Sequence, residues 1–306
     1  MLHLERTIDT DTKLGICIPF WGDIDYLKIA VESVRNQRDD RWTLTVINDA
    51  HPDARVDEYF ASLTDARIRY VRNAQNLGIT ANFRRCIQFA TEPLVVILGY
   101  DDLLLPTYVG SIIAAHEQYP DAAVIQPGVR VIDGEGRASE PLVDAVKQRL
   151  LRPSAHVPIL LQGDVHAARL MHGNWLYWPS LAFRRDVLEK HDFRDQFAVI
   201  QDLALILDIL LAGEALLVIQ DVAFCYRRHD ASASSTELVD GSRFAGEREF
   251  FQLASGLARA HGWRRTTVAA RLHATSRLHA LVLLPQALRI LDRRGVAVLL
   301  RHVFGP

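Results

Sequence analysis

The sequence predicts an α/β protein with a mostly parallel central sheet and helices on both of its faces. Short apolar runs alternate with segments of helical periodicity from Leu14 onward. This alternation is typical of βαβ units, in which helices cover both sides of a parallel sheet. Of the 306 residues, 49% are hydrophobic and 24% are charged, so the chain can bury a large core.

The N-terminal part of the chain supplies the regular elements of this pattern. Residues 14–19 form an apolar run that ends at Pro19, and residues 27–34 carry apolar side chains at helical spacing. Each helix then connects two parallel strands. Further strands are predicted at residues 43–49, 67–71 and 94–98, and a further helix over residues 79–90.

The following segments are predicted to be less regular. Residues 133–164 contain GEG, several prolines and weak periodicity, which indicate a loop that lies over a site. A helix is expected over residues 201–213, because leucine and isoleucine recur on one face and Gly213 can end it. A strand pair at residues 215–219 and 222–229 follows this helix.

The α/β domain is expected to span residues 1–235, followed by a helical extension over residues 236–306. Between Arg264 and Pro306 there are eight arginines and a single acid, Asp292, interleaved with apolar stretches. Two interpretations fit this composition. The extension can make peripheral contact with an anionic membrane near a lipid-linked acceptor, or it can pack on the core or form an oligomer interface with solvated arginines.

The totals argue against several classes of protein. A formal net charge of −2 gives no general reason to expect nucleic acid as a partner. Cys17, Cys86 and Cys225 are far apart in apolar surroundings, as in a protein with reduced thiols. The first residues lack the pattern of a signal peptide, and no apolar run reaches the roughly 18 residues needed to span a bilayer. We therefore expect a cytoplasmic protein.

Polar side chains gather at the predicted ends of four strands. Because ligands bind beyond the carboxyl ends of parallel strands, these residues predict one binding edge. In chain order they are Asp23, Asn48, Asp49, Asn73, Asn76, Asp101 and Asp102.

The adjacent pair Asp101 and Asp102 poses a charge problem, because neighbouring carboxylates repel each other and lose hydration when they leave water. A divalent cation, Mg²⁺ or Mn²⁺, held by their oxygens would neutralise them and bridge to the phosphates of a ligand. The alternative is a solvated loop whose aspartates cap the helix expected from Pro106 and Thr107.

Three further residues each have a functional and a structural interpretation. Asp49 can accept a base N–H or a ribose hydroxyl, or it can cap the following turn. Asp202 can act as a general base, or it can interact with the dipole of the helix in which it lies. His229, beside Arg227 and Arg228, can contact phosphates or a metal, or it can be structural. The motifs of dinucleotide-binding dehydrogenases, P-loop proteins, zinc proteases and esterases are absent from the sequence.

Taken in order, these segments resemble the family 2 inverting glycosyltransferases of the GT-A fold, over roughly residues 14–235. ICIPFWGDIDYLKIAVESVRNQ is similar to the opening IPxYN strand, loop and helix, and VINDAHPD resembles the V(D/N)DGSxD segment. The most specific match is NLGITANFRRCIQFATEPLVVILGYDDLLLP, which resembles a family stretch that ends in DDxxxP. GNWLYWPSLAFRRDVL, IQDLALILDILLAG and YRRHDASAS are similar to the PSxxxFRR, EDxxL and YRxH segments.

The resemblance implies an enzyme that moves a sugar from a UDP-, dTDP- or GDP-sugar to a hydroxyl of a glycan or lipid-linked acceptor, in the synthesis of cell-envelope polysaccharide or glycolipid. It implies Mg²⁺ or Mn²⁺ as cofactor. Pro19 and Phe20 would border the nucleotide, with Asp101 beside it. Asp49 would bind its base or ribose, and Asn76 would line its pocket.

The same resemblance implies the catalytic roles. Asp101 and Asp102 match the metal-binding end of the DDxxxP stretch, and His229 would lie near the diphosphate or the metal. Asp202 matches the base that takes the proton of the acceptor hydroxyl, while attack from the opposite face inverts the anomeric carbon.

The sequence departs from the family pattern at several positions. Gly99 stands where many members carry the first aspartate of a DxD motif, and Gln201 replaces the glutamate before the base. Ala50 and His51 replace a Gly-Ser pair. These departures motivate an alternative, a catalytically degenerate GT-A domain that binds a nucleotide sugar or glycan without turnover. A nucleotidyltransferase is disfavoured, because PFWGDID offers no Gly-rich basic loop after the first strand.

Overall fold

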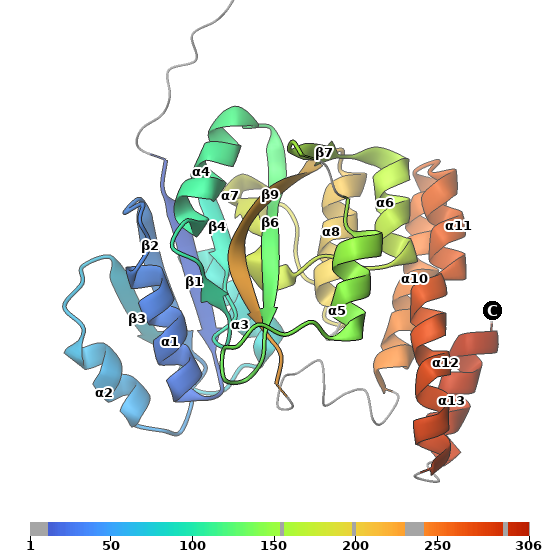
Figure 1. Cartoon of the computed structure of the whole chain (residues 1–306), viewed down its shortest axis with the longest axis horizontal. Helices are drawn as coiled ribbons and strands as arrows, with labels where there is room; N and C mark the ends of the chain where they lie inside the picture. The colour runs from blue at the N-terminus through green and yellow to red at the C-terminus, as the bar shows by residue number, and fades with distance from the viewer. Residues whose placement is uncertain (1–11, 154–155, 198–199, 230–241, 290–292, 306) are drawn as a thin grey trace, which may run out of the picture.

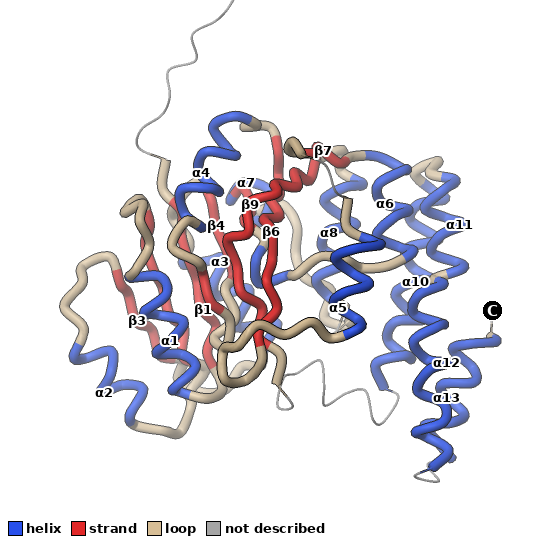
Figure 2. The backbone as a smooth tube through the Cα atoms, viewed as in Figure 1, coloured by secondary structure: helices blue, strands red, loops and turns tan. Residues whose placement is uncertain are grey.

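The computed structural model describes residues 12–153, 156–197, 200–229, 242–289 and 293–305. These residues form a nine-stranded sheet with helices on both faces and a further group of helices beside it (Figures 1 and 2). The strand order is β3-β2-β1-β4-β8-β6-β9-β5, and β7 pairs with β9. This arrangement confirms the predicted α/β class.

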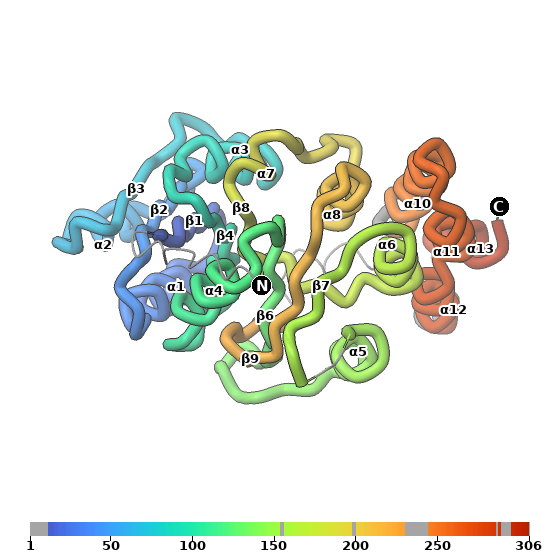
Figure 3. The backbone as a smooth tube through the Cα atoms, turned by 90° about the horizontal axis from the view of Figure 1, so that it is seen from above, coloured from blue at the N-terminus to red at the C-terminus, as the bar shows by residue number. Residues whose placement is uncertain are grey.

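The N-terminal half of the sheet is parallel, as predicted. Its elements are β1 (Leu14–Phe20), α1 (Ile24–Arg35), β2 (Trp42–Asn48), α2 (Arg55–Ser62), β3 (Ile68–Arg72), α3 (Ile79–Phe89) and β4 (Leu94–Ile97). β1 and β4 are buried almost throughout, because α1 covers one face of the sheet and α3 the other (Figure 3). Phe20 lies in register with Asn48, and Asn48 with Arg72, so these strands end at one edge of the sheet.

The second half of the sheet mixes strand directions. Its elements are β5 (Leu103–Leu104), α4 (Tyr108–Gln118), β6 (Ala122–Ile132), a short 3-10 helix (Trp178–Ser180), β8 (Ala182–Arg184), α7 (Arg185–Leu188), α8 (Gln201–Leu211) and β9 (Ala215–Arg227). β8 is antiparallel to both β4 and β6, so β6 and its parallel neighbour β9 run in the direction of β1 to β4. The sheet is therefore mostly parallel, with β5, β7 and β8 reversed.

The strand pair predicted at residues 215–219 and 222–229 is wrong, because the segment forms the single strand β9. This strand changes register against β6 near Gly128. A Cβ atom at Gly128 would lie 2.9 Å from the carbonyl oxygen of Gln220. Glycine therefore lets β9 bulge at this point without a break in the strand.

The predicted loop over residues 133–164 contains regular structure. Its elements are α5 (Leu142–Val146), a π-helical turn (Lys147–Leu151), β7 (Ile159–Leu161) and the start of α6 (Gly163–His172). α5 lies beside the sheet, in front of α8, in Figure 1, and its Asp144 is buried. Polar contacts of a buried acid, rather than an apolar stripe, hold this segment, so periodicity did not reveal it.

The C-terminal part of the chain is helical, as predicted. Its helices are α10 (Ser242–Ala260), α11 (Arg264–Leu272), α12 (Ala274–Arg289) and α13 (Arg293–Phe304). Phe250 of α10 and Ala269 of α11 belong to the same hydrophobic core as α8. α12 and α13 pack with Phe244 of α10 and Leu299 in a second, small core. The domain boundary predicted after residue 235 lies outside the described residues.

The interior of the protein is apolar on both faces of the sheet. One core surrounds α1 and α4, and the other surrounds α3 and α8. Cys17, Cys86 and Cys225 are buried and unpaired, as predicted for reduced thiols. Among the helices of the described ranges, none combines the length and apolar character needed to cross a bilayer.

Candidate active site

The carboxyl ends of β1, β2, β4 and β9 meet at the lower edge of the sheet in Figure 1. The starts of α1, α3 and α8 lie at the same edge (Figure 1). The polar side chains buried there are Asn48, Asp49, Asn73, Asn82, Asp102 and Arg227. The structure therefore brings the predicted strand-end residues to one edge, and their hydrogen bonds show what each of them does.

Asp49 orders the loop that follows β3. Its Oδ1 accepts hydrogen bonds from the backbone N–H of Leu77 at 2.9 Å and from Asn73 Nδ2 at 2.7 Å. Its Oδ2 accepts from the N–H of Gly78 at 2.9 Å, and Asp49 is only 2% exposed. These contacts give Asp49 a structural role in the loop, and its contact with a base or ribose stays a prediction. Asn76 is among the exposed residues of this loop, and its Oδ1 accepts from the N–H of Gly78.

Aromatic side chains surround the end of β1. Phe20 is fully buried, and its ring contacts those of His51 and Tyr100 at centroid distances of 5.2 and 5.7 Å. The Phe20 ring therefore supports its neighbours from within the protein, and the position of Phe20 at the border of a nucleotide stays a prediction. Pro19 is half-buried in β1. Trp21, which the prediction missed, is 48% exposed and lies edge-on to His51.

Gly99 leaves space for the side chains of Asp101 and Asp102. A Cβ atom at Gly99 would lie 2.6 Å from Asp102 Oδ2 and 3.0 Å from Asp101 Oδ1. The 2.6 Å contact is shorter than a relaxed structure allows, so the Asp102 carboxylate would have to shift. An aspartate at this position, as in the DxD motif, would displace both carboxylates, so packing accounts for the departure from the family pattern.

The two aspartates occupy different environments. Asp102 is 2% exposed, and its Oδ1 accepts a hydrogen bond from the N–H of Arg227 at 2.8 Å. Burial, with the charge of Asp101, raises the pKa of Asp102 well above its usual range. Asp101 is 20% exposed, and its Oδ2 lies 2.8 Å from His229 Nε2. Asp102 is thus the enclosed member of the pair and Asp101 the more accessible one, and the role of Asp102 as a metal ligand stays a prediction.

Arg227 hydrogen-bonds to the segments around Asp101 and Asp102. Its position at the end of an apolar strand is a sequence signal for a buried arginine, which needs hydrogen-bond acceptors. Its Nε donates to the carbonyl oxygen of Asp101 at 2.7 Å. Its Nη1 donates to the carbonyl oxygens of Asp133 and Gly134 at 3.1 and 2.8 Å. The guanidinium also lies 4.7 Å from the centre of the Tyr26 ring. Arg227 thus fixes the backbone that carries Asp101.

His229 and Asp101 are paired with each other, and their role at a metal stays a prediction. The imidazole pairs with the carboxylate through Nε2 and lies 5.2 Å from the Tyr26 ring. Within the described ranges, no three His, Cys, Asp or Glu side chains form a group that could hold a metal ion. A cation at Asp101 would therefore take further ligands from a bound molecule, and phosphate oxygens are suitable donors. The Ser-rich segment after His229 lies outside the described residues.

Asp202 lies in the first turn of α8, where it is partly exposed. The neighbouring Gln201 joins this helix to the edge, because its Oε1 accepts a hydrogen bond from Thr80 Oγ1 at 2.8 Å. Thr80 lies in the first turn of α3, close to Gly78 and therefore to the loop that Asp49 orders. Gln201 is 5% exposed, a burial that suits an amide better than the charged glutamate of the family pattern.

A second polar network, which the sequence did not predict, attaches α5 to the end of β9. Arg228 donates from Nε and Nη2 to the two carboxylate oxygens of Asp144, at 2.6 and 3.1 Å. The hydroxyl of Tyr177 donates to the same carboxylate at 2.9 Å. Burial and the charge of Asp144 raise the pKa of Tyr177, so its hydroxyl stays protonated as a donor. The network places α5 beside the strand end that carries His229.

Comparisons with known proteins agree with this fold. The profile of Glycosyl transferase family 2 matches residues 15–190, more than half of the chain. The chain is similar to the uncharacterized protein MT1568 of Mycobacterium tuberculosis (strain CDC 1551 / Oshkosh), with 24% identity over 242 residues. The aligned part covers 77% of this chain and 73% of that protein.

Solved structures with the same fold include S. aureus TarS 1–349. Its complex with UDP-GlcNAc matches with a TM-score of 0.63 and 12% identity, over 95% of this chain and 90% of that chain. Its complex with UDP matches with a TM-score of 0.56 and 13% identity, over 96% and 92% of the two chains. At these identities the likeness shows the fold, which is the predicted GT-A fold. With the family profile extending from β1 beyond α7, the chain belongs to glycosyl transferase family 2.

Proposed function

We propose that this glycosyltransferase moves a sugar from a nucleotide-sugar donor to a hydroxyl of a glycan or lipid-linked acceptor, with inversion at the anomeric carbon. One observation carries the proposal: the Asp101–His229 pair and the first turn of α8, which contains Asp202, lie at the same edge of the sheet. One acid is thereby available for the diphosphate end of the donor, and a second for the acceptor.

The donor nucleotide is expected along the ends of β1 and β2. Trp21, exposed beside His51, offers a ring face on which a base can stack. Asn76 offers amide groups for hydrogen bonds from the loop that Asp49 orders. Since the TarS structures contain UDP-GlcNAc and UDP, a UDP-sugar is the first donor to test, ahead of dTDP- and GDP-sugars.

Asp101 is the acid of this edge that best fits a divalent cation. Its carboxylate is partly exposed, and among the described residues only its Oδ2 is paired, with His229. Its other oxygen can bind Mg²⁺ or Mn²⁺, for which carboxylate and diphosphate oxygens are suitable ligands. When bound, such a cation supplies the positive charge that stabilises a departing nucleoside diphosphate.

Asp202 is the proposed general base. The acceptor hydroxyl loses its proton as it attacks the anomeric carbon, and a partly exposed carboxylate at the start of α8 can accept that proton. The hydrogen bond between Gln201 and Thr80 positions this turn of α8 against α3. Attack from the face opposite the leaving diphosphate inverts the configuration of the transferred sugar.

The decisive experiment is Asp202→Asn, assayed for UDP-sugar binding and for transfer. We expect kcat to fall by roughly 10²–10⁴-fold, the usual contribution of a general base, while the donor Kd stays close to the wild-type value. Asp40→Asn is the matched control, because Asp40 is exposed before the start of β2, at the opposite edge of the sheet. Wild-type turnover by Asp202→Asn would overturn the assignment. Donor binding by the wild type without any turnover would support the alternative, a nucleotide-sugar binding module.

The metal role is tested separately by titrating UDP with and without Mn²⁺. We expect Mn²⁺ to strengthen UDP binding to the wild type and to Asp40→Asn, but not to Asp101→Asn. The reason is that Asp101 is the carboxylate that joins the cation to the protein. If Mn²⁺ strengthened binding equally in all three proteins, Asp101 would not be a metal ligand.

A further inference from the structure

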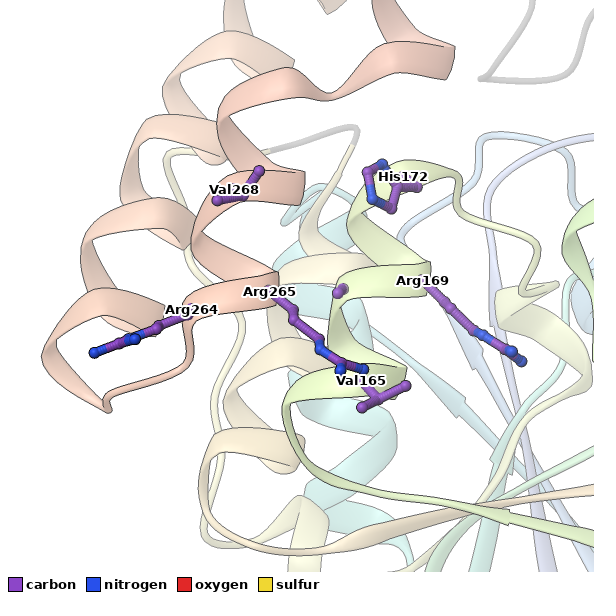
Figure 4. A pocket seen from close by; sticks show the side chains of 7 residues that line it. Val165, Arg169, His172, Arg264, Arg265 and Val268 are labelled. Carbon is purple, nitrogen blue, oxygen red and sulfur yellow. The ribbon is translucent and has the colours of Figure 1, made fainter.

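A shallow pocket lies between α6 and α11, at the upper right of Figure 1 and away from the lower edge of the sheet (Figures 1 and 4). Its volume is about 470 Å³. Its walls contain three arginines, a histidine and small apolar side chains, and no acid lines it. The lining residues are Val165, Ala168, Arg169, His172, Arg264, Arg265 and Val268.

We propose that this pocket, with the exposed sides of α11 and α12, binds the surface of an anionic phospholipid membrane. The inference goes beyond the transfer reaction and does not depend on it.

The first argument is uncompensated charge. Arg169, Arg264 and Arg265 are exposed, and their guanidinium groups form no ion pair within the part of the chain that the structure describes. The nearest acid, Asp164, uses its carboxylate to accept from the N–H groups of Arg265 and Thr266 at 3.0 and 2.7 Å, which caps α11. Its charge offsets only part of that of Arg265, so the pocket keeps a net positive potential that attracts anions.

The second argument is the direction of the side chains. In Figure 4, Arg265 reaches from α11 towards Val165 of α6, Arg264 points away from α6, and Arg169 extends from the far side of α6. Guanidinium groups that diverge in this way cannot converge on one small anion. They suit a surface on which several negative head groups are spread out.

The third argument separates a membrane from a soluble polyanion. Val165 and Val268 are 42% and 54% exposed at the pocket itself. α12 continues this face, because Thr275 Oγ1 donates to the carbonyl oxygen of His172 at 2.5 Å. Apolar groups in an interface gain from burial among lipid chains, whereas an acidic polymer in water gives them nothing. Large apolar side chains exposed along α11 and α12 include Leu272, Leu278, Leu281 and Val282.

The test is sedimentation of the full chain with vesicles of phosphatidylcholine alone and of an equal mixture with phosphatidylglycerol. We expect binding to the mixture only. Arg264→Gln with Arg265→Gln should weaken it by roughly 30-fold, because two basic residues leave the anionic surface. Arg35→Gln with Arg38→Gln is the control of equal charge on α1 and its following turn, across the molecule, and should bind close to wild type. Equal binding by both double variants would overturn the proposal.

A second pair of variants tests the apolar contribution. Val268→Ser with Val282→Ser should also weaken vesicle binding, whereas Val222→Ser, which changes an exposed valine of β9, should not. Unchanged urea unfolding of each variant shows that the fold is intact. Two results would overturn the proposal: no vesicle binding by the wild type, or binding that ignores the valines and is displaced by soluble polyphosphate. The second result would point to an acidic polymer as the partner.

Discussion

The sheet edge that carries the candidate active site and the C-terminal helices use charged side chains in opposite ways. At the edge, Arg227 is 3% exposed and donates to three carbonyl oxygens, and Asp49 accepts from three donors. On α11, Arg264 and Arg265 are exposed to solvent. The difference shows two uses of charge. At the edge, hydrogen bonds hold the charged side chains in fixed positions, whereas on the helices the charged side chains are exposed to solvent.

The energetic consequence differs in the same way. Removing one member of a buried polar network leaves its partners without hydrogen bonds in a place that water does not reach. Removing an exposed arginine leaves only solvated groups behind. The same type of substitution should therefore change the free energy of unfolding by different amounts in the two regions.

The largest contrast is expected for arginine to methionine. Arg227→Met should lower the free energy of unfolding by about 3–5 kcal/mol, because the carbonyl oxygens of Asp101, Asp133 and Gly134 lose their donor and buried Asp102 loses a nearby positive charge. Arg264→Met should change it by less than about 0.5 kcal/mol, as is usual for an exposed position. Urea unfolding measures both. Similar losses in the two variants would break the comparison.

The next contrast concerns pH, because the protonation of one buried group in the C-terminal helices affects their stability. His302 is 1% exposed, and burial, with the charges of His273 and Arg248, lowers its pKa to about 4 against the opposing effect of Glu247. The folded protein therefore holds His302 neutral, whereas the unfolded chain protonates it near pH 6.5. Its contribution is fully present above pH 6.5 and is lost as the pH falls towards 4, by about 3 kcal/mol.

Hydrogen exchange at pH 7 and pH 4.5 should show this loss in α12 and α13 of the wild type. In His302→Gln the same helices should be less stable at pH 7 but should respond less to acid, since the titrating group is gone. Parallel responses of the two proteins to pH would show that His302 is not the group responsible.

A smaller contrast is expected for glycine to alanine. Gly99→Ala should destabilise the protein by about 1–3 kcal/mol, because the new Cβ would lie 2.6 Å from Asp102 Oδ2. Gly256→Ala, in α10, should stabilise it by about 0.5–1 kcal/mol, because nothing lies within 4 Å of an added Cβ and alanine favours the helix. Thermal unfolding should therefore move in opposite directions, and a stabilised Gly99→Ala protein would refute the packing explanation for that glycine.

The smallest contrast is expected for the reverse substitution, alanine to glycine. Ala50 has φ +60°, the left-handed region that favours glycine, at the position where the family pattern has glycine. Ala50→Gly should stabilise the protein by about 0.5 kcal/mol, because the relief of strain exceeds the added flexibility of the unfolded chain. Ala260→Gly, at the exposed end of α10, should destabilise it by about 0.5–1 kcal/mol. Calorimetry of both variants, measured in parallel, checks these differences in stability.

The sequence by itself determined the parallel elements and the edge at which they end. β1, β2 and β4 are apolar runs whose burial follows from local composition, and the ends of parallel strands meet because of the fold class alone. The family motifs likewise predicted roles for Asp101, Asp202 and His229, because those motifs are contiguous in the chain.

Only the tertiary structure decided which of the neighbouring acids faces solvent and what each buried group binds. Asp101 and Asp102 are adjacent in sequence, yet one pairs with His229 and the other is enclosed beneath Arg227, 125 residues away. The pair between Arg228 and Asp144 joins residues 84 positions apart. Partners at such separations are chosen by how distant segments pack, which leaves no periodic or compositional trace in either segment.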